Sequence, residues 1–140
     1  MEKWGFLVFL TVAVGQDLRN RSVGQGFLAA AGGIGAAISL LSGRGLPEVT
    51  ASVSAGILLL ILGWITGGGI GEGDGWFFTV TGLFLEPAEN WILLLSGLIF
   101  CSVYSLAYVA ASLIGGGCVR KKRLPFLPFL LPVGLWLALF

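Results

Sequence analysis

The sequence contains no histidine and only two cysteines, Cys101 and Cys118, among its 140 residues. Without histidine, Ser–His and Cys–His catalytic pairs and imidazole metal ligands are excluded. The two cysteines do not form a CxxC pattern, so they indicate neither a zinc site nor a disulfide framework. Charge is also scarce, because Asp, Glu, Lys and Arg make up only 11% of the chain. The groups left for chemistry are mainly carboxylates, and we expect no metal, no cofactor and no nucleic-acid partner.

Hydrophobic residues account for 56% of the sequence, and charged residues fall far below the roughly one quarter that is usual in soluble domains. A helix that crosses a bilayer needs roughly 20 apolar residues. We therefore expect an all-α membrane protein, with one domain over residues 1–140 built as a bundle of about six transmembrane helices. The expected crossings are about 1–18, 23–41, 49–66, 76–85, 91–114 and 124–140.

The first segment has an alternative interpretation as a signal peptide, because Lys3 precedes an apolar run that ends at the small residues Ala13 and Gly15. Glu2 offsets the charge of Lys3, however, and further apolar segments follow. We therefore favour a membrane helix for this segment.

The positions of Lys and Arg predict which side of the membrane each turn faces. Residues 19–21 contain two of these cations and residues 120–123 contain four, whereas only Lys3 and Arg44 lie elsewhere. In a bundle of alternating crossings, both of these turns share one side with the glycine-rich turn at 67–75. The positive-inside rule makes this side cytosolic and places both termini on the non-cytosolic side of the cell membrane.

Two aspartates interrupt the apolar pattern. Asp17 ends the first apolar run, and Asp74 lies in the glycine-rich break. Only 37 residues separate Glu48 from Glu86, although two crossings need roughly 40, so we expect the break to be drawn into the membrane boundary. Both carboxylates then lie at the cytosolic boundary, where charged groups are costly and usually functional.

Two neighbouring carboxylates share a proton and titrate as a unit, which is the arrangement used by aspartic proteases. One carboxylate takes a proton from water while the other protonates or hydrogen-bonds the peptide carbonyl. Gly71, Gly73 and Gly75 would allow unusual backbone conformations and a close approach by a substrate strand. The simpler interpretations are an ordinary interhelical turn for the glycines and a helix end facing the interface for Asp17.

The sequence resembles the type IV prepilin peptidases, which are membrane aspartic proteases of the GxGD group. Residues Asp17–Val23 are similar to the family motif D-x-R-x-x-x-[IV], and Gly71–Asp74 reads GEGD. A weaker similarity, at Pro125–Leu130, is to the family's P-F-G-P-F-L. Three positions depart from these patterns: Leu127 replaces the usual glycine, Gly75-Trp76 stands where a lysine is common, and Gly24-Gln25 stands where Pro-Asn is common.

The resemblance implies that Asp17 and Asp74 are the catalytic pair. It also implies that the substrates are prepilin-like or pseudopilin-like membrane precursors of type IV pilus or protein secretion systems. Each would carry a short basic leader before an apolar helix and would be cut at the cytosolic membrane face. Larger family members add a zinc-binding loop and N-methylate the new terminus, so we expect a form that acts only as a peptidase.

Other charged residues near the expected site have two interpretations each. Glu72 is either a solvated turn residue or a group that reads substrate charge or tunes a pKa. Arg19 and Arg21 are topology determinants and anchors to membrane lipids, with a role in keeping Asp17 ionised as the alternative. The run at 120–123 is either a topology signal or a recognition element for the leader.

Two other functions use the same residues. Paired carboxylates in a membrane also suit a small transporter or a proton-conducting subunit, and a non-catalytic membrane scaffold would need neither aspartate. Cleavage of a precursor distinguishes the peptidase from both, and ion flux distinguishes the transporter.

Overall fold

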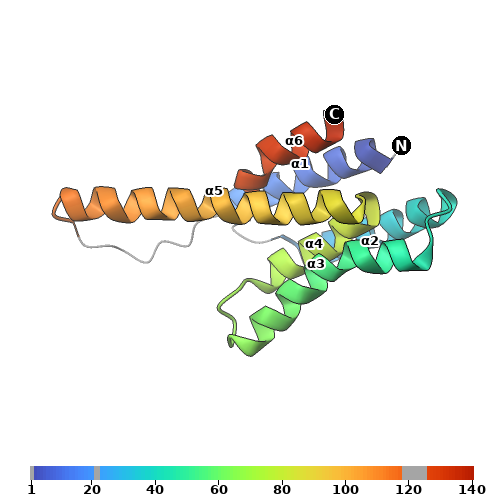
Figure 1. The fold of residues 1–140 in the computed structure, drawn as a ribbon, viewed down its shortest axis with the longest axis horizontal. Coiled ribbons are helices and arrows are strands. Elements are labelled where there is room, and N and C mark those ends of the chain that lie inside the picture. Colours follow the sequence, from blue (N-terminus) through green and yellow to red (C-terminus); the bar gives the residue numbers. More distant parts are fainter. Residues whose placement is uncertain (1, 21–22, 118–125) are drawn as a thin grey trace.

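The computed structural model describes residues 2–20, 23–117 and 126–140, and every regular element in these ranges is helical. This confirms the all-α expectation. Figure 1 shows their arrangement. The elements are α1 (Glu2–Asn20), α2 (Gln25–Leu41), α3 (Leu46–Ile65), α4 (Glu72–Phe84), α5 (Pro87–Ile114), the short 3₁₀ helix η1 (Leu127–Leu130) and α6 (Leu131–Leu139).

The first and last helices lie side by side, with both chain ends at the same end of the assembly (Figure 1). Lys3 of α1 explains part of this arrangement, because its ammonium group donates to the carbonyl of Leu137 at 3.2 Å and pairs with Glu89 of α5 at 3.2 Å. The N-terminus of α1, the C-terminus of α6 and the N-terminus of α5 therefore meet at one end. Consecutive helices run in opposite directions, as a bundle of alternating segments requires.

Glycines bring α3 and α4 into close contact. A Cβ atom at Gly56 of α3 would overlap the backbone of Thr79, and one at Gly82 of α4 would lie 2.7 Å from the carbonyl oxygen of Ser52. Apolar tails of lipids are as hydrophobic as leucine, so helices in lipid associate through such close backbone packing. The pair α3–α4 lies at an angle to α5 (Figure 1).

Phenylalanine rings join α1, α2 and α4. The ring of Phe9 stacks on Phe77 at a centroid distance of 5.2 Å, on Phe27 at 5.5 Å and on Phe84 at 5.9 Å. Phe9, Phe77 and Phe84 are buried. Such offset aromatic pairs add about 0.5–1.5 kcal/mol each beyond their buried area. They fix α4, and so its first turn, against α1.

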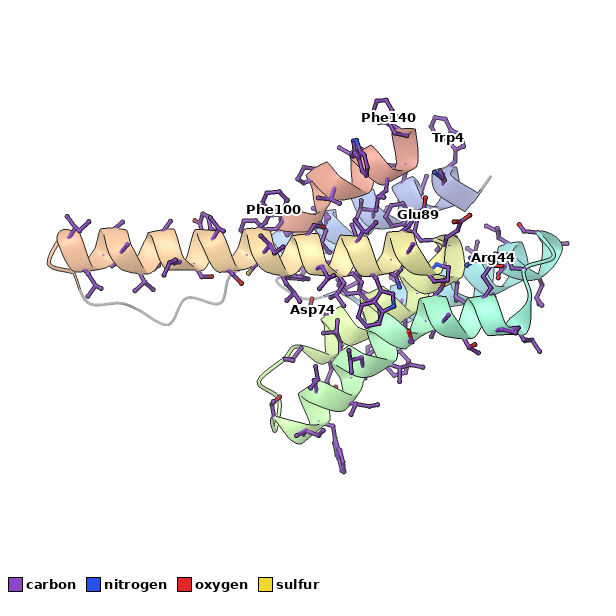
Figure 2. All side chains as sticks on the ribbon, in the orientation of Figure 1. Trp4, Arg44, Asp74, Glu89, Phe100 and Phe140 are labelled. Carbon is purple, nitrogen blue, oxygen red and sulfur yellow. The ribbon has the colours of Figure 1, made fainter. Side chains whose placement is uncertain are left out.

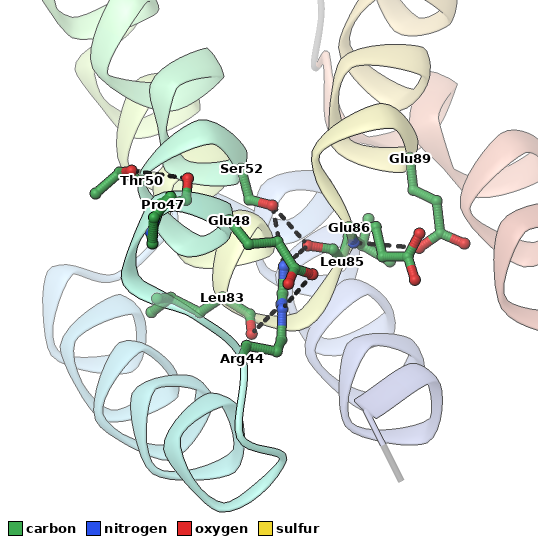
Figure 3. A network of polar contacts seen from close by, with 9 residues as sticks. All are labelled: Arg44, Pro47, Glu48, Thr50, Ser52, Leu83, Leu85, Glu86 and Glu89. Carbon is green, nitrogen blue, oxygen red and sulfur yellow. Dashed lines mark hydrogen bonds and ion pairs between the residues drawn. The ribbon is translucent and has the colours of Figure 1, made fainter.

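A polar network closes the opposite end of α4 (Figure 3). The Arg44 guanidinium donates to the carbonyls of Leu83 at 3.2 Å and Leu85 at 2.8 Å, and to the hydroxyl of Ser52 at 3.0 Å. It also pairs with Glu48 at 3.2 Å. The last carbonyls of a helix have no partner within that helix, so Arg44 supplies partners that the chain after α4 does not.

The boundaries of several helices differ from the expected segments. Helix α3 begins at Leu46 instead of 49, and the described part of the segment expected at 124–140 forms η1 and α6 instead of one helix. We expected a turn at 67–75 and a crossing from 76, but α4 begins at Glu72. Gly71 is its N-cap, and acidic side chains in a first turn interact favourably with the helix dipole. The tight turn instead uses positive φ angles at Gly67 (62°) and Gly68 (90°). Helix α5 begins at Pro87 instead of 91, because Glu86 and Glu89 form a capping box.

Two helices of the described ranges are long and apolar enough to cross a bilayer, α3 with 20 residues and α5 with 28. Helix α5 is about 42 Å long at 1.5 Å per residue, which exceeds the roughly 30 Å hydrocarbon core. Its second half extends beyond the other helices (Figure 1) and exposes apolar side chains such as Leu106, Leu113 and Ile114, and Phe100 near the middle of α5 is exposed as well (Figure 2). Large exposed apolar surfaces of this kind fit a membrane environment.

Candidate active site

Asp17 lies near the C-terminal end of α1, and only 7% of its surface is exposed. Its Oδ2 atom accepts a hydrogen bond of 3.2 Å from the backbone N–H of Leu127, the first residue of η1. The two residues are 110 positions apart in the sequence. The fold therefore brings the first and third motifs together at one carboxylate.

The local sequence of η1 explains why Leu127 is the donor. The first N–H groups of a helix have no carbonyl partner within that helix. Pro128 has no N–H at all, and the N–H of Phe129 already donates to the carbonyl of Phe126 at 3.1 Å. Asp17 therefore binds the unpaired donor at the start of η1. Pro125, which belongs to the same motif, lies outside the described residues.

Asp74 lies in the first turn of α4 and is partly exposed (Figure 2). Its backbone N–H donates to the carbonyl of Gly71 at 3.1 Å, and its carboxylate lies close to the same residue. A Cβ atom at position 71 would lie 3.2 Å from Oδ2 of Asp74. Gly71 therefore leaves the space that the carboxylate occupies.

The structure places the two carboxylates within electrostatic range of each other. Asp74 lies ahead of the crossing expected at 76–85, and burial, reinforced by the charge of Asp17, raises its pKa to about 6. No hydrogen bond joins the two side chains, both of which are described. A carboxyl whose pKa lies near 6 next to a carboxylate gives a pair that keeps one proton at mildly acidic pH. This is the protonation state needed for acid–base hydrolysis.

A family comparison agrees with this geometry. The model of the type IV leader peptidase family matches residues 4–118. The chain belongs to the type IV leader peptidase family. The matched span contains both aspartates, and the family implies a protease. Neither a curated protein nor a solved structure matched the chain. Membership in this family, together with the spans α3 and α5, indicates a membrane protein.

The other glycines near Asp74 do not adopt unusual backbone conformations. Gly73 and Gly75 lie within α4, and neither they nor Gly71 has a positive φ angle. A Cβ atom at Gly75 would lie 2.7 Å from the side chain of Leu60, whereas one at Gly73 would meet nothing within 4 Å. Gly75 therefore serves the contact between α3 and α4, and Gly73 leaves open space beside Asp74. Whether that space receives a substrate stays a prediction.

The charged residues considered near the site are solvent-exposed where they are described. Glu72 begins α4 and Arg19 lies in the last turn of α1, and neither has a hydrogen bond or an ion pair among the described residues. Arg21 and residues 120–123 lie outside the described ranges. The exposure of Glu72 agrees with a solvated turn residue. Its role at the site, and the roles of Arg19 as a lipid anchor or as a group that keeps Asp17 ionised, stay predictions.

A groove of about 600 Å³ runs along the α1 face that carries Arg19, and it is lined by Val12, Gly15, Gln16, Arg19, Asn20 and Gly24. In an α-helix, positions 12, 15, 16 and 19 form one stripe, and position 17 points away from it. The groove therefore lies on a different face of α1 from the Asp17 carboxylate. In the part of the chain that the structure describes, no cluster of three or more His, Cys, Asp or Glu could hold a metal ion.

The contact between Asp17 and Leu127 was not foreseen from the sequence. The similarity of Pro125–Leu130 to a family motif indicated that this segment matters, but it did not indicate which residue the segment contacts. Helix pairing over such a separation depends on packing of the whole bundle.

Proposed function

We propose that this leader peptidase family member is an aspartic endopeptidase that removes the short leader of prepilin-like or pseudopilin-like membrane precursors at the cytosolic membrane face. Asp17 and Asp74 are its catalytic pair in this proposal. The observation that carries it is that these two residues come from different helices, α1 and α4, which pack against each other, and that the charge of Asp17 helps burial to raise the pKa of Asp74.

The proposed enzyme crosses the cell membrane about six times and keeps both termini on the non-cytosolic side. Two observations support this topology. Lys3, Glu89 and the carbonyl of Leu137 meet at one end of the bundle. Asp17, near the C-terminal end of α1, and Asp74, in the first turn of α4, lie away from that end. A peptide bond next to the substrate's own membrane helix would be presented at the depth of the pair.

The chemistry requires only the pair and one water molecule. The ionised carboxyl takes a proton from the water as its oxygen attacks the peptide carbonyl carbon, while the protonated carboxyl gives its proton to the carbonyl oxygen. The resulting tetrahedral diol then collapses, the C–N bond breaks and the amide nitrogen receives a proton. The pair returns to its starting state with one proton.

Co-expression with a tagged prepilin-like precursor tests the proposal. Asp17→Asn and Asp74→Asn should each reduce leader cleavage by at least about 100-fold, because general acid–base groups contribute roughly 10²–10⁴ in rate. Glu48→Gln is the matched control, since it makes the same carboxylate-to-amide change on an exposed residue at the other end of the bundle. Undiminished cleavage in both aspartate variants would rule the proposal out.

The alternative, ion transport through the same carboxylates, has its own readout. Purified protein in liposomes would then conduct protons or cations, the same two variants would abolish the flux, and no precursor would be cleaved. Silent variants in both assays would instead indicate a scaffold.

A further inference from the structure

The two aspartates of the pair differ in their hydrogen bonding. Oδ2 of Asp17 accepts the backbone N–H of Leu127 at 3.2 Å, whereas the side chain of Asp74 has no hydrogen-bond donor among the described residues. A backbone N–H bond to a carboxylate stabilises its ionised form. Only one oxygen of Asp17 is used in this contact, so its Oδ1 atom is left for a water molecule.

The donor at Leu127 is held in place from two sides. The side chain of Leu127 is 1% exposed and that of Leu130 is fully buried. A Cβ atom at Gly97 of α5 would collide with Leu130 and would lie 3.1 Å from the ring of Phe126. The short helix η1 is therefore packed between α1 and α5. The N–H of Leu127 cannot move away from Asp17 without unpacking this layer.

Within residues 2–20, 23–117 and 126–140, other charges do not account for the difference between the two aspartates. The elements packed against α1 are α2, α4, η1 and α6, and three of them (α2, η1 and α6) contain no charged residue. Helix α4 contributes only Glu72 and Asp74 itself, while Glu89 of α5 pairs with Lys3 at the far end. Arg19 on α1 is exposed. Burial by itself favours the neutral form of Asp17, so the Leu127 N–H is the group that opposes it.

We propose that the backbone N–H of Leu127 keeps Asp17 as the ionised member of the pair, so that Asp17 is the general base and Asp74 the general acid. This assignment rests on the peptidase function proposed above. Leu127 is a positioning residue, because it acts on the substrate only through Asp17.

The assignment fixes the path of each proton. Asp17 takes a proton from water as the water oxygen bonds to the carbonyl carbon, and Asp74 gives its proton to the carbonyl oxygen. Asp17 then gives its proton to the amide nitrogen, Asp74 takes one from a hydroxyl of the diol, and the C–N bond breaks. The products are a carboxylic acid and an amine, and the pair ends with Asp17 ionised and Asp74 protonated.

The test replaces Leu127 with its α-hydroxy analogue, which keeps the side chain but exchanges the backbone N–H for an ester oxygen. Losing this donor should move the acidic limb of the pH profile of kcat/KM upward by about one to two pH units, since hydrogen bonds to charged groups are among the stronger ones. The matched control makes the same ester exchange at Phe129, whose backbone N–H donates to the carbonyl of Phe126 and not to Asp17. It removes another backbone donor of η1 and keeps the Leu127 N–H, so it should leave the acidic limb in place.

A Leu127 ester variant with the acidic limb of the unmodified enzyme would overturn the assignment, and so would an equal shift in the Phe129 ester variant. If the unmodified enzyme cleaves no precursor, the proposed function fails instead, so the two failures are distinguishable.

Infrared difference spectroscopy on the full chain provides a second measurement that does not depend on the folding of the ester variant. At about pH 5.5, near the raised pKa of Asp74, the protonated-carboxyl band should disappear in Asp74→Asn and persist in Asp17→Asn. The reverse pattern would make Asp74 the base and overturn the assignment.

Discussion

The guanidinium of Arg44 donates a hydrogen bond of 2.8 Å to the carbonyl oxygen of Leu85, directly after the last turn of α4. Arg44 precedes α3, and its side chain is only 7% exposed. One side chain therefore connects the loop before α3 to the end of α4 (Figure 3). The depth of α4 in the bundle, and with it the position of Asp74 at its other end, depends on this connection.

Arg44→Ala should destabilise the protein by about 1–3 kcal/mol, because the Leu83 carbonyl loses its Arg44 donor and the Leu85 carbonyl keeps only the donor from Ser52. Thermal unfolding in detergent, followed by circular dichroism, measures the change. Glu48→Gln is the control. Glu48 is the exposed partner of Arg44, with 44% of its side chain accessible, and exposed ion pairs contribute about 0–1 kcal/mol. Equal effects of the two substitutions would contradict a capping role for Arg44.

Asn90 makes a second prediction for the same region. It is fully buried, its amide donates to the carbonyls of Ser52 at 2.7 Å and Phe78 at 3.1 Å, and it accepts from Thr81 at 2.8 Å. Asn90→Ala should cost about 1–3 kcal/mol, because the Ser52 carbonyl loses its Asn90 donor and the Thr81 hydroxyl keeps only its bond to the Phe78 carbonyl. The same unfolding assay checks this.

Ser96→Ala on the same helix is the comparison for Asn90→Ala. The Ser96 hydroxyl donates only to carbonyls of its own helix, those of Ile92 and Leu93, so the change should stay within about 0.5 kcal/mol. A neutral Asn90→Ala would show that the network does not join α3, α4 and α5.

Features that depend on residues close together in the sequence could be predicted, whereas contacts between distant segments could not. Apolar run length and the clustering of cations are local properties, and they indicated helices and the importance of Asp17 and Asp74. The start of α4 was not foreseen, because Gly71, Gly73 and Gly75 have poor helix propensity. Packing against α3 overrides this preference, and such packing is not visible in a local pattern. The bond from Leu127 to Asp17 spans 110 residues and depends on the whole bundle.

Gly56 should tolerate no side chain. The backbone of Thr79 occupies the space where a Cβ atom of residue 56 would lie. Gly56→Ala therefore forces α3 and α4 apart and should cost about 1–3 kcal/mol through overpacking. Displacing α4 also moves Asp74, so cleavage of the precursor should fall together with stability. Gly33→Ala on the exposed face of α2 is the control, since a Cβ there meets nothing within 4 Å. It should be neutral or stabilise by up to about 1 kcal/mol.

Cleavage should depend on pH through Asp74. Its pKa is raised to about 6 by burial and by the charge of Asp17, so the protonated form is favoured in the folded protein. The folded state then binds this proton more tightly than the unfolded state does, and the stability from this group is lost as pH rises from about 4 through 6. Hydrolysis needs the same proton, so kcat/KM should fall as pH rises through about 6.

Two measurements check this dependence. A pH series of precursor cleavage in detergent should show the descending limb near pH 6, and a parallel series of melting temperatures should show stability decreasing over the same range. Asp74→Asn removes the titrating group while keeping a similar shape, so the part of the stability change between about pH 4 and 6 that comes from this residue should disappear. If stability in Asp74→Asn keeps the full dependence, another group is responsible, and Asp74 does not hold the shared proton.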